Sequence, residues 1–272
     1  MSMTGGISFF EKNKTLYEDG GRCVASSNTA DQNLPLGTNK YFTWESSGSD
    51  DTTTETLTIT LPESVEISRI FLIGHNFKQF QIKYGAAQNF AGVTGLDAYS
   101  GALISETTFA RDAAYYEFTP VTTDTVTITI DKTQTVDAEK EINQIIITNE
   151  IGTLVGYPKI TGAKFDRDDR TDQSVSGRSH VEKGYETSSF GLDLSSYPGQ
   201  ADINILEGLH DRNEAFLVWL NGGVPDNFTY TQRGFRVGDV YQMQTVGGLP
   251  TGYYKNIYPA AVEQSYRFLE VV

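Results

Sequence analysis

Hydrophobic and polar residues alternate along most of the first 150 positions, which is the pattern of β-strands with one buried face. Clusters of Gly, Asn, Asp and Pro separate the alternating runs, as turns require. No segment before residue 150 shows the spacing of a helix. The pattern therefore predicts an all-β sandwich in the first half of the chain. The predicted strands are 56–61, 65–73, 80–84, 115–118, 126–130 and 142–147.

The second half is also rich in strand patterns but includes one helix. Ile203, Leu206 and Leu209 recur at a spacing of three, and Pro198 suits the first turn of a helix over 198–210. A Gly- and Pro-containing stretch at 150–158 separates the halves. We therefore expect a mostly β protein with an N-terminal arm (1–20), a β-sandwich (21–154) and a β-barrel or sandwich module (155–272). The strands predicted in the module are 158–166, 174–185, 188–194, 215–220, 228–235, 240–245 and 260–271.

The charge of the chain restricts its partners. The 272 residues carry a net charge of −14, so phosphate backbones and anionic lipid surfaces are repelled. Sequence-specific nucleic-acid binding and membrane association are therefore not expected. The N-terminus lacks the basic and apolar regions of a signal peptide. The single cysteine, Cys23, provides neither an intrachain disulfide nor a cysteine-based zinc site.

The first half contains, in this order, Tyr41-Phe-Thr-Trp44-Glu-Ser46, Val65-x-Ile67-x-x-Ile70-x-Leu72, Gly74-His75-Asn76-Phe77, Phe80-x-Ile82-x-Tyr84, Tyr116-x-Phe118 and Ile142-x-x-Ile145-x-Ile147. This order resembles the discoidin-type, galactose-binding-like jelly rolls, which implies that the sandwich at 21–154 is a jelly roll. The resemblance covers about residues 20–150 and includes an early Trp44 followed by Ser46, then a long strand and the loop that contains His75. This chain departs from the secreted members of the family, which usually join the ends of the domain by a disulfide, because it has a single cysteine.

The second half is similar, in its order of elements, to the ring-forming modules of phage tail-tip proteins. This resemblance implies a structural component of a phage-like tail tip or baseplate, made in the host cytoplasm and located in the virion tail. Its partners would be copies of itself in a homo-oligomeric ring and other tail or baseplate proteins, with the jelly roll bracing neighbours or contacting a host glycan. The alternative is a monomeric, lectin-like carbohydrate-binding protein, and a glycan-degrading enzyme stands third.

Loops at strand ends provide the candidate ligand-binding residues, because loops carry function on a rigid scaffold. His75 could contact a ligand or could be a core histidine hydrogen-bonded to the backbone. Trp44 could stack on a sugar, but a core or interface role is favoured for an aromatic of this size. The candidate ligand-binding residues are His75, Asn76, Tyr99, Tyr115, Asp50 and Asp51.

Five residues are candidates for contacts with neighbouring subunits: Phe9, Phe10, Arg167, Arg170 and Trp219. Two of them lie in the acidic stretch 166–172, which we also considered as a calcium loop. That stretch lacks the glycine and the twelfth-position acid of an EF-hand. A solvated, self-paired loop is the favoured interpretation.

No motif for catalysis or for a cofactor is present. The sequence has no G-x-S-x-G, no histidine at metal-ligand spacing from another ligand, and no glycine loop between a strand and a helix. Acidic residues are so frequent that a pair at glycosidase spacing carries no weight. We therefore expect a binding protein without a metal or cofactor, and not an enzyme.

Overall fold

The computed structural model describes residues 6–38, 42–48, 50–93, 104–108, 112–154, 159–167, 170–173, 179–182, 186–193, 200–212, 214–222, 240–245 and 265–270. The chain divides into two compact units. The jelly-roll unit is Phe10–Glu150. The split unit consists of Met1–Phe9 and Ile151–Val272, so both ends of the chain contribute to it.

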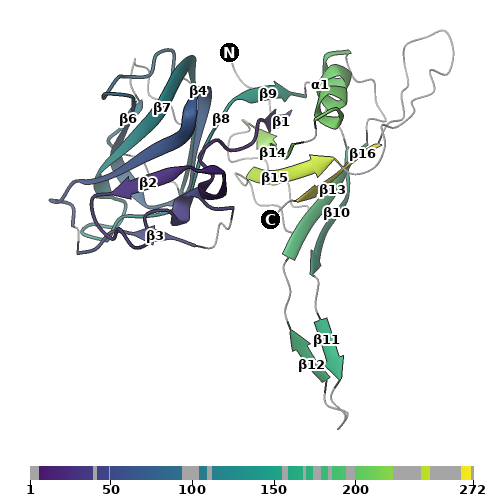
Figure 1. Cartoon of the computed structure of the whole chain (residues 1–272), viewed down its shortest axis with the longest axis horizontal. Helices are drawn as coiled ribbons and strands as arrows, with labels where there is room; N and C mark the ends of the chain where they lie inside the picture. The colour runs from purple at the N-terminus through teal and green to yellow at the C-terminus, as the bar shows by residue number, and fades with distance from the viewer. Residues whose placement is uncertain are drawn as a thin grey trace. The chain divides into compact units, whose positions relative to one another are not determined.

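The jelly-roll unit is an antiparallel β-sandwich whose strands form one hydrogen-bonded network (Figure 1). The strands are ordered β3-β8-β4-β7-β5-β6, and β2 pairs with β4. Two short 3-10 helices, Tyr17–Asp19 and Leu34–Leu36, lie in its connections. Its strands are β2 (Arg22–Ala25), β3 (Trp44–Glu45), β4 (Glu55–His75), β5 (Phe77–Tyr84), β6 (Ile104–Glu106), β7 (Ala113–Thr133) and β8 (Glu141–Thr148).

Two strands of 21 residues, β4 and β7, join the layers of the sandwich. Residues 57–60 of β4 pair with β2, whereas residues 69–75 pair with β8. The β4–β7 register shifts between Thr60 and Val65, where strands that pass between layers commonly bend. The sequence pattern divides each of these long strands in two, because the side chains at the bend are exposed and interrupt the apolar alternation.

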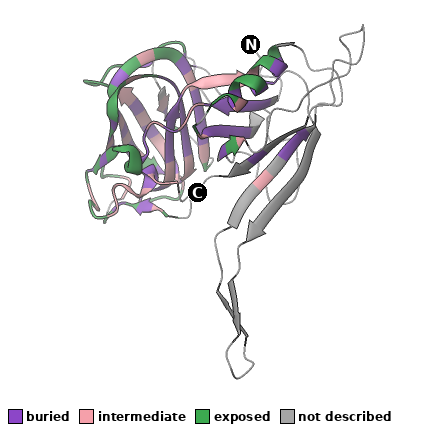
Figure 2. Cartoon of the chain, turned by 45° about the vertical axis from the view of Figure 1, so that its right-hand side comes forward, coloured by how far each residue is buried: buried purple, intermediate pink, exposed green. Residues whose placement is uncertain are grey.

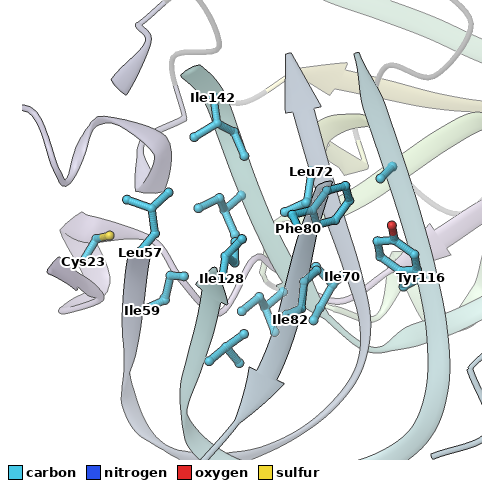
Figure 3. Packing of buried hydrophobic residues seen from close by; sticks show 14 of the residues in the cluster. Cys23, Leu57, Ile59, Ile70, Leu72, Phe80, Ile82, Tyr116, Ile128 and Ile142 are labelled. Atoms are coloured by element: carbon cyan, nitrogen blue, oxygen red, sulfur yellow. The ribbon is translucent and has the colours of Figure 1, made fainter. Parts of the chain in front are cut away.

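The core of the jelly-roll unit is filled from nearly every strand. Leu57 and Ile59 of β4 meet Ile128 of β7 on one side, and Ile70 and Leu72 continue the same core along β4 (Figure 3). Figure 2 shows that buried residues follow the strands while exposed residues gather in the loops. The period-two alternation therefore correctly predicted the buried face at Leu57 and Ile59, whereas residues 67–72 of β4 are buried on both faces.

The segment predicted to be an N-terminal arm is part of both units. Gly6–Phe10 forms strand β1, and the residues after it run along the edge of β8. The Lys14 amide donates to the Ile147 carbonyl (2.9 Å), and the Ile147 amide donates to Asn13 Oδ1 (3.0 Å). A side-chain hydroxyl, Thr15 Oγ1, donates to the Ile145 carbonyl (3.0 Å). These bonds cover the otherwise open edge of β8.

A buried ionic cluster lies at the last residues of the jelly-roll unit. Arg69 of β4 is 8% exposed. Its Nη2 lies 2.6 Å from Glu150 Oε2 and 3.2 Å from Glu117 Oε1. Arg69 and Glu117 are also opposite each other on β4 and β7. The cluster therefore links β4 and β7 to the point where the chain leaves this unit.

The split unit contains a seven-stranded sheet ordered β10-β13-β16-β15-β14-β1-β9 and the helix α1 (Gln200–His210). The helix confirms the spacing of Ile203, Leu206 and Leu209, which are all buried. Gly152 of β9 lies against Ile205, where any added Cβ would be 2.6 Å from Ile205 Cδ1. The strands are β1 (Gly6–Phe10), β9 (Glu150–Thr153), β10 (Lys159–Arg167), β13 (Glu186–Asp193), β14 (Phe216–Gly222), β15 (Val240–Thr245) and β16 (Ser265–Glu270).

A second, two-stranded sheet is nested inside the β10–β13 hairpin. Strands β11 (Arg170–Gln173) and β12 (Ser179–Glu182) follow β10 and precede β13 along the chain. They pair with each other, from Arg170 with Glu182 to Gln173 with Ser179. Within the part of the chain that the structure describes, neither pairs with another strand (Figure 1).

Candidate ligand-binding site

One end of the jelly-roll unit brings two loops together, residues 42–54 and 133–141. They are joined where β3 pairs with β8, with Trp44 opposite Ile142. The side chain of Trp44 is fully buried in the core, so it anchors the first loop and does not provide a sugar platform. The Ser46 amide donates to the Lys140 carbonyl, and the Lys140 amide donates to Ser46 Oγ, both at 2.8 Å.

Asp50 and Asp51, two of the predicted ligand residues, hold these loops in shape. Asp50 Oδ1 accepts bonds from the Thr52 amide (2.9 Å) and hydroxyl (2.7 Å), and these bonds lower the pKa of Asp50. Asp51 Oδ1 accepts the Thr133 amide at 3.0 Å, which lowers the pKa of Asp51. The fully buried Lys140 donates from Nζ to the Asp50 carbonyl at 2.6 Å. The described contacts of both aspartates are therefore structural.

His75 and Asn76 are also committed to the fold. His75 is 3% exposed, its Nδ1 accepts the Phe77 amide (3.1 Å), and its ring packs against those of Phe77 and Phe80. Burial lowers the pKa of His75 to about 3, so the imidazole is neutral near pH 7. Asn76 donates to the Glu139 carbonyl at 2.7 Å and accepts the Glu141 amide at 3.1 Å. Of the two alternatives for His75, the structure shows the core histidine hydrogen-bonded to the backbone.

Tyr115, which was predicted to contact a ligand from an exposed position, is buried in the structure. It is 2% exposed, and its ring centroid lies 4.7 Å from that of Phe71 and 6.3 Å from that of Phe10. Burial raises the pKa of Tyr115. The register of β4 and β7 explains this, because Phe71 and Tyr115 are opposite each other and Ile70 and Tyr116 face the core. Tyr99 lies outside the described residues.

The side chains open to solvent at this end include a group of carboxylates among exposed serine and threonine hydroxyls. Glu45 and Glu141 are both exposed and are opposite each other on β3 and β8. Glu139 is half-buried and accepts the Gly48 amide at 2.8 Å. Partial desolvation, together with the charges of Glu139 and Glu141 and a hydrogen bond from Glu139, raises the pKa of Glu45. We call Glu45, Glu139 and Glu141 the carboxylate rim.

Two apolar side chains are exposed on the same loops. Phe42 is 56% exposed and precedes β3, and Val136 is 70% exposed in the loop before β8. A site of this kind can accept hydrogen bonds from hydroxyl or ammonium groups and can cover an apolar patch of a ligand. Sequence analysis missed the carboxylate rim because only strand pairing brings residue 45 beside residues 139 and 141.

Of the five predicted interface residues, the structure describes the side chains of three. Phe9, Phe10 and Trp219 are at most 3% exposed, so they are core residues of the chain itself and not an exposed interface. The side chains of Arg167 and Arg170 lie outside the described residues. Their backbones end β10 and begin β11, so the acidic stretch 166–172 is divided between two strands and is not a single loop.

Searches for a metal site and for a membrane span gave no candidate. Among the described residues, no group of three or more His, Cys, Asp or Glu side chains could hold a metal ion, and this includes the carboxylate rim. Within the same residues, no helix is long and apolar enough to cross a membrane.

Comparison with known proteins gives matches to solved structures alone. No family model matches the chain, and no curated protein matches it. Chitosan-binding module 1 of a Paenibacillus chitosanase/glucanase matches at 16% identity and a TM-score of 0.40, over 51% of this chain and 99% of the module. The family 32 carbohydrate-binding module of Clostridium perfringens NanJ, solved with galactose, matches at 15% identity and a TM-score of 0.38, over 53% and 99%.

A fucosidase from Ruminococcus gnavus, of family GH29, also matches, at 14% identity and a TM-score of 0.38. The match covers 51% of this chain and 27% of the fucosidase. The solved structures that resemble about half of this chain thus include carbohydrate-binding modules. Identities and TM-scores this low give no information about ligand or activity.

Proposed function

We propose that the jelly-roll unit binds a glycan and that the chain is a binding protein and not an enzyme. The proposal rests on the carboxylate rim, in which Glu45 and Glu141 are exposed, and on the exposed ring of Phe42, three residues before Glu45 in the same loop. Carboxylates accept strong hydrogen bonds from sugar hydroxyls and from ammonium groups. An aromatic face suits the apolar side of a sugar ring.

The charge of the rim defines the glycan class. Three neighbouring carboxylates repel sulfated, phosphorylated and sialylated sugars, and the net charge of −14 adds to this repulsion. Neutral sugars and amino sugars are the expected ligands. An amino sugar would also relieve the like-charge repulsion that raises the pKa of Glu45.

A glycan array followed by calorimetry tests this function. The expected result is binding of neutral or amino sugars at micromolar affinity, at least tenfold weaker binding by Glu45→Gln/Glu141→Gln and by Phe42→Ala, and no hydrolysis of the bound glycan. Glu63→Gln provides a matched control, because Glu63 is an exposed acid on the bend of β4. The proposal fails if no glycan binds, or if the control variant loses as much affinity as the rim variants.

A second function, assembly in a phage-like tail tip, is favoured by the nested β11–β12 sheet. A two-stranded sheet is marginally stable in water, and each of its strands has one described partner. Free strand edges invite pairing with another chain. We propose that this sheet contacts a neighbouring copy in a ring and that the chain is a virion tail component with other tail proteins as partners.

Light scattering after size exclusion tests the second function. The native chain should form oligomers at high concentration. A variant in which residues 168–185 are replaced by an Asn-Gly turn should be a monomer, since Arg167 and Glu186 are opposite each other and a tight turn can join them. A native chain that stays monomeric, or a shortened chain that still assembles, would exclude the hairpin as the assembly element.

A further inference from the structure

The split unit is completed by a strand that comes from the other end of the chain. In its sheet, β1 lies between β14 and β9, and in the described sheet β1 is the one strand neighbour of β9. The chain leaves this unit after Phe9 and returns at Ile151, so the whole jelly-roll unit separates β1 from the other strands. β1 therefore resembles a bound peptide, because it pairs with strands that are far from it in the sequence.

The contacts of β1 have the two features of strand-mediated peptide recognition. Backbone and side-chain bonds align it, since the Leu154 amide donates to the Ile7 carbonyl (2.9 Å) and Ser8 Oγ lies 2.7 Å from Thr153 Oγ1. Alternate side chains then enter the core, where Ile7 and Phe9 are 5% and 0% exposed. In strand addition, such bonds give affinity and such side chains give specificity.

Phe9 is the anchor of this strand. Its ring centroid lies 6.1 Å from that of Phe216 on β14 and 6.0 Å from that of Phe268 on β16. These two rings also meet each other edge to face at 5.9 Å. The three aromatic side chains form the centre of the split unit's core, to which β1 contributes one of them.

We propose that the groove between β14 and β9 is a strand-acceptor site. Its ligand is an apolar strand with the pattern Ile-Ser-Phe, provided in this structure by residues 6–10 of the same chain. When that strand is disabled, the site accepts the same segment from a second molecule. This inference depends on neither of the proposed functions.

The two tryptophans of the chain make the test possible, because Trp44 is buried in the jelly-roll unit and Trp219 in the split unit. Full-length Phe9→Asp would be made in a Trp44→Phe background, where Trp219 reports unfolding, and in a Trp219→Phe background, where Trp44 reports it. Each variant would be compared with the same single-tryptophan protein that retains Phe9. The urea midpoint reported by Trp219 should fall, and the midpoint reported by Trp44 should not change. Tyr17→Asp, at a 48% exposed aromatic residue, should move neither midpoint.

Rescue in trans is the decisive measurement. A synthetic peptide of residues 6–12 should raise the Trp219 midpoint of the Phe9→Asp chain in a saturable manner, and a labelled copy should bind that chain but not the native one. The same peptide with Phe9→Asp should do neither. The milder Phe9→Ala chain repeats the test if the aspartate prevents folding. Equal shifts of both midpoints, or no response to the peptide in either variant, would overturn the proposal.

Discussion

Glu45 and Glu141 are opposite each other on adjacent antiparallel strands, β3 and β8, and both are exposed to solvent. Like charges at directly opposed positions destabilise a sheet. Natural proteins keep such arrangements at sites where function compensates for the lost stability. The pair is therefore the feature of the jelly-roll unit that most needs a functional explanation.

Replacing one member of this pair with the opposite charge should stabilise the protein. Glu141→Lys is expected to raise the free energy of unfolding by about 0.5 kcal/mol at low salt, as an opposed pair of unlike charges does. The pKa of Glu45 should fall, because the lysine removes a repelling charge. Carboxyl-carbon NMR titration of Glu45 and urea unfolding measure the two effects, and an unchanged Glu45 pKa would show that the carboxylates do not interact.

Protonation of His75 should destabilise the jelly-roll unit in acid. The pKa of His75 is about 3 in the folded chain and about 6.5 when unfolded. Stability from neutral His75 is thus complete above pH 6.5 and is lost as the pH falls toward 3, by about 1.4 kcal/mol per pH unit.

His75→Gln separates this effect from the titration of the many acidic residues. Urea midpoints reported by Trp44 should fall less steeply between pH 6.5 and 5 in the glutamine variant than in the native chain. Parallel pH profiles would mean that His75 is already charged in the folded protein.

Arg69 should contribute far more to stability than an exposed ion pair of equal length. Arg69→Met leaves Glu150 and Glu117 without their cation, and because these carboxylates are 24% and 33% exposed, about 2 kcal/mol of unfolding free energy should be lost. Lys12 also lies 2.6 Å from a carboxylate, that of Asp19, but both side chains are more than a third exposed. Lys12→Met should therefore cost less than about 1 kcal/mol. Denaturant unfolding measures the loss of unfolding free energy in both variants. Equal losses would mean that the Arg69 side chain is not buried in the folded protein.

Two glycines with nearly the same backbone conformation should respond differently to alanine. Gly74 has φ of 63° and Gly48 has φ of 66°, so either substitution should cost about 1 kcal/mol for the left-handed backbone. A Cβ at Gly74 would also lie 2.7 Å from Asn143 Cγ, whereas nothing lies within 4 Å at Gly48. Overpacking should add about 1–3 kcal/mol at Gly74 alone. Thermal or urea unfolding of both variants measures the difference.

The sequence predicts strands well where apolar residues alternate over many positions. The 240–245 strand and the helix ending at residue 210 agree closely with β15 and α1. Trp44–Glu45 was missed because two residues are too few to show a period, and Gly6–Phe10 was assigned to an N-terminal arm. The predicted 228–235 strand lies outside the described residues. The assignment of Gly6–Phe10 to a distant sheet depends on tertiary pairing, which no local pattern contains.

The candidate site was only partly predictable for a related reason. Loop position directed the prediction to the end of the jelly-roll unit that contains Asp50 and Asn76, but it could not indicate which side chains there are exposed. Both residues satisfy backbone groups in the loops. The rim residues Glu45 and Glu141 are 96 positions apart in numbering and meet only through the β3–β8 pairing. Hydrogen bonds within the loops and the register of the strands therefore determine which side chains of the site are exposed. Both are properties of the folded chain and are absent from the local sequence pattern.

The contact between Phe9 and Phe268 also has a consequence for synthesis on the ribosome. Residue 268 is 259 positions after residue 9, so at about 5–20 residues per second the strand that contains Phe9 is synthesised on the order of tens of seconds before its core partner. The jelly-roll unit is complete once residue 150 has emerged and can fold during that interval. A ribosome that stops early would thus release a folded jelly roll with an exposed, aromatic N-terminal strand, which is a substrate for chaperones or proteases.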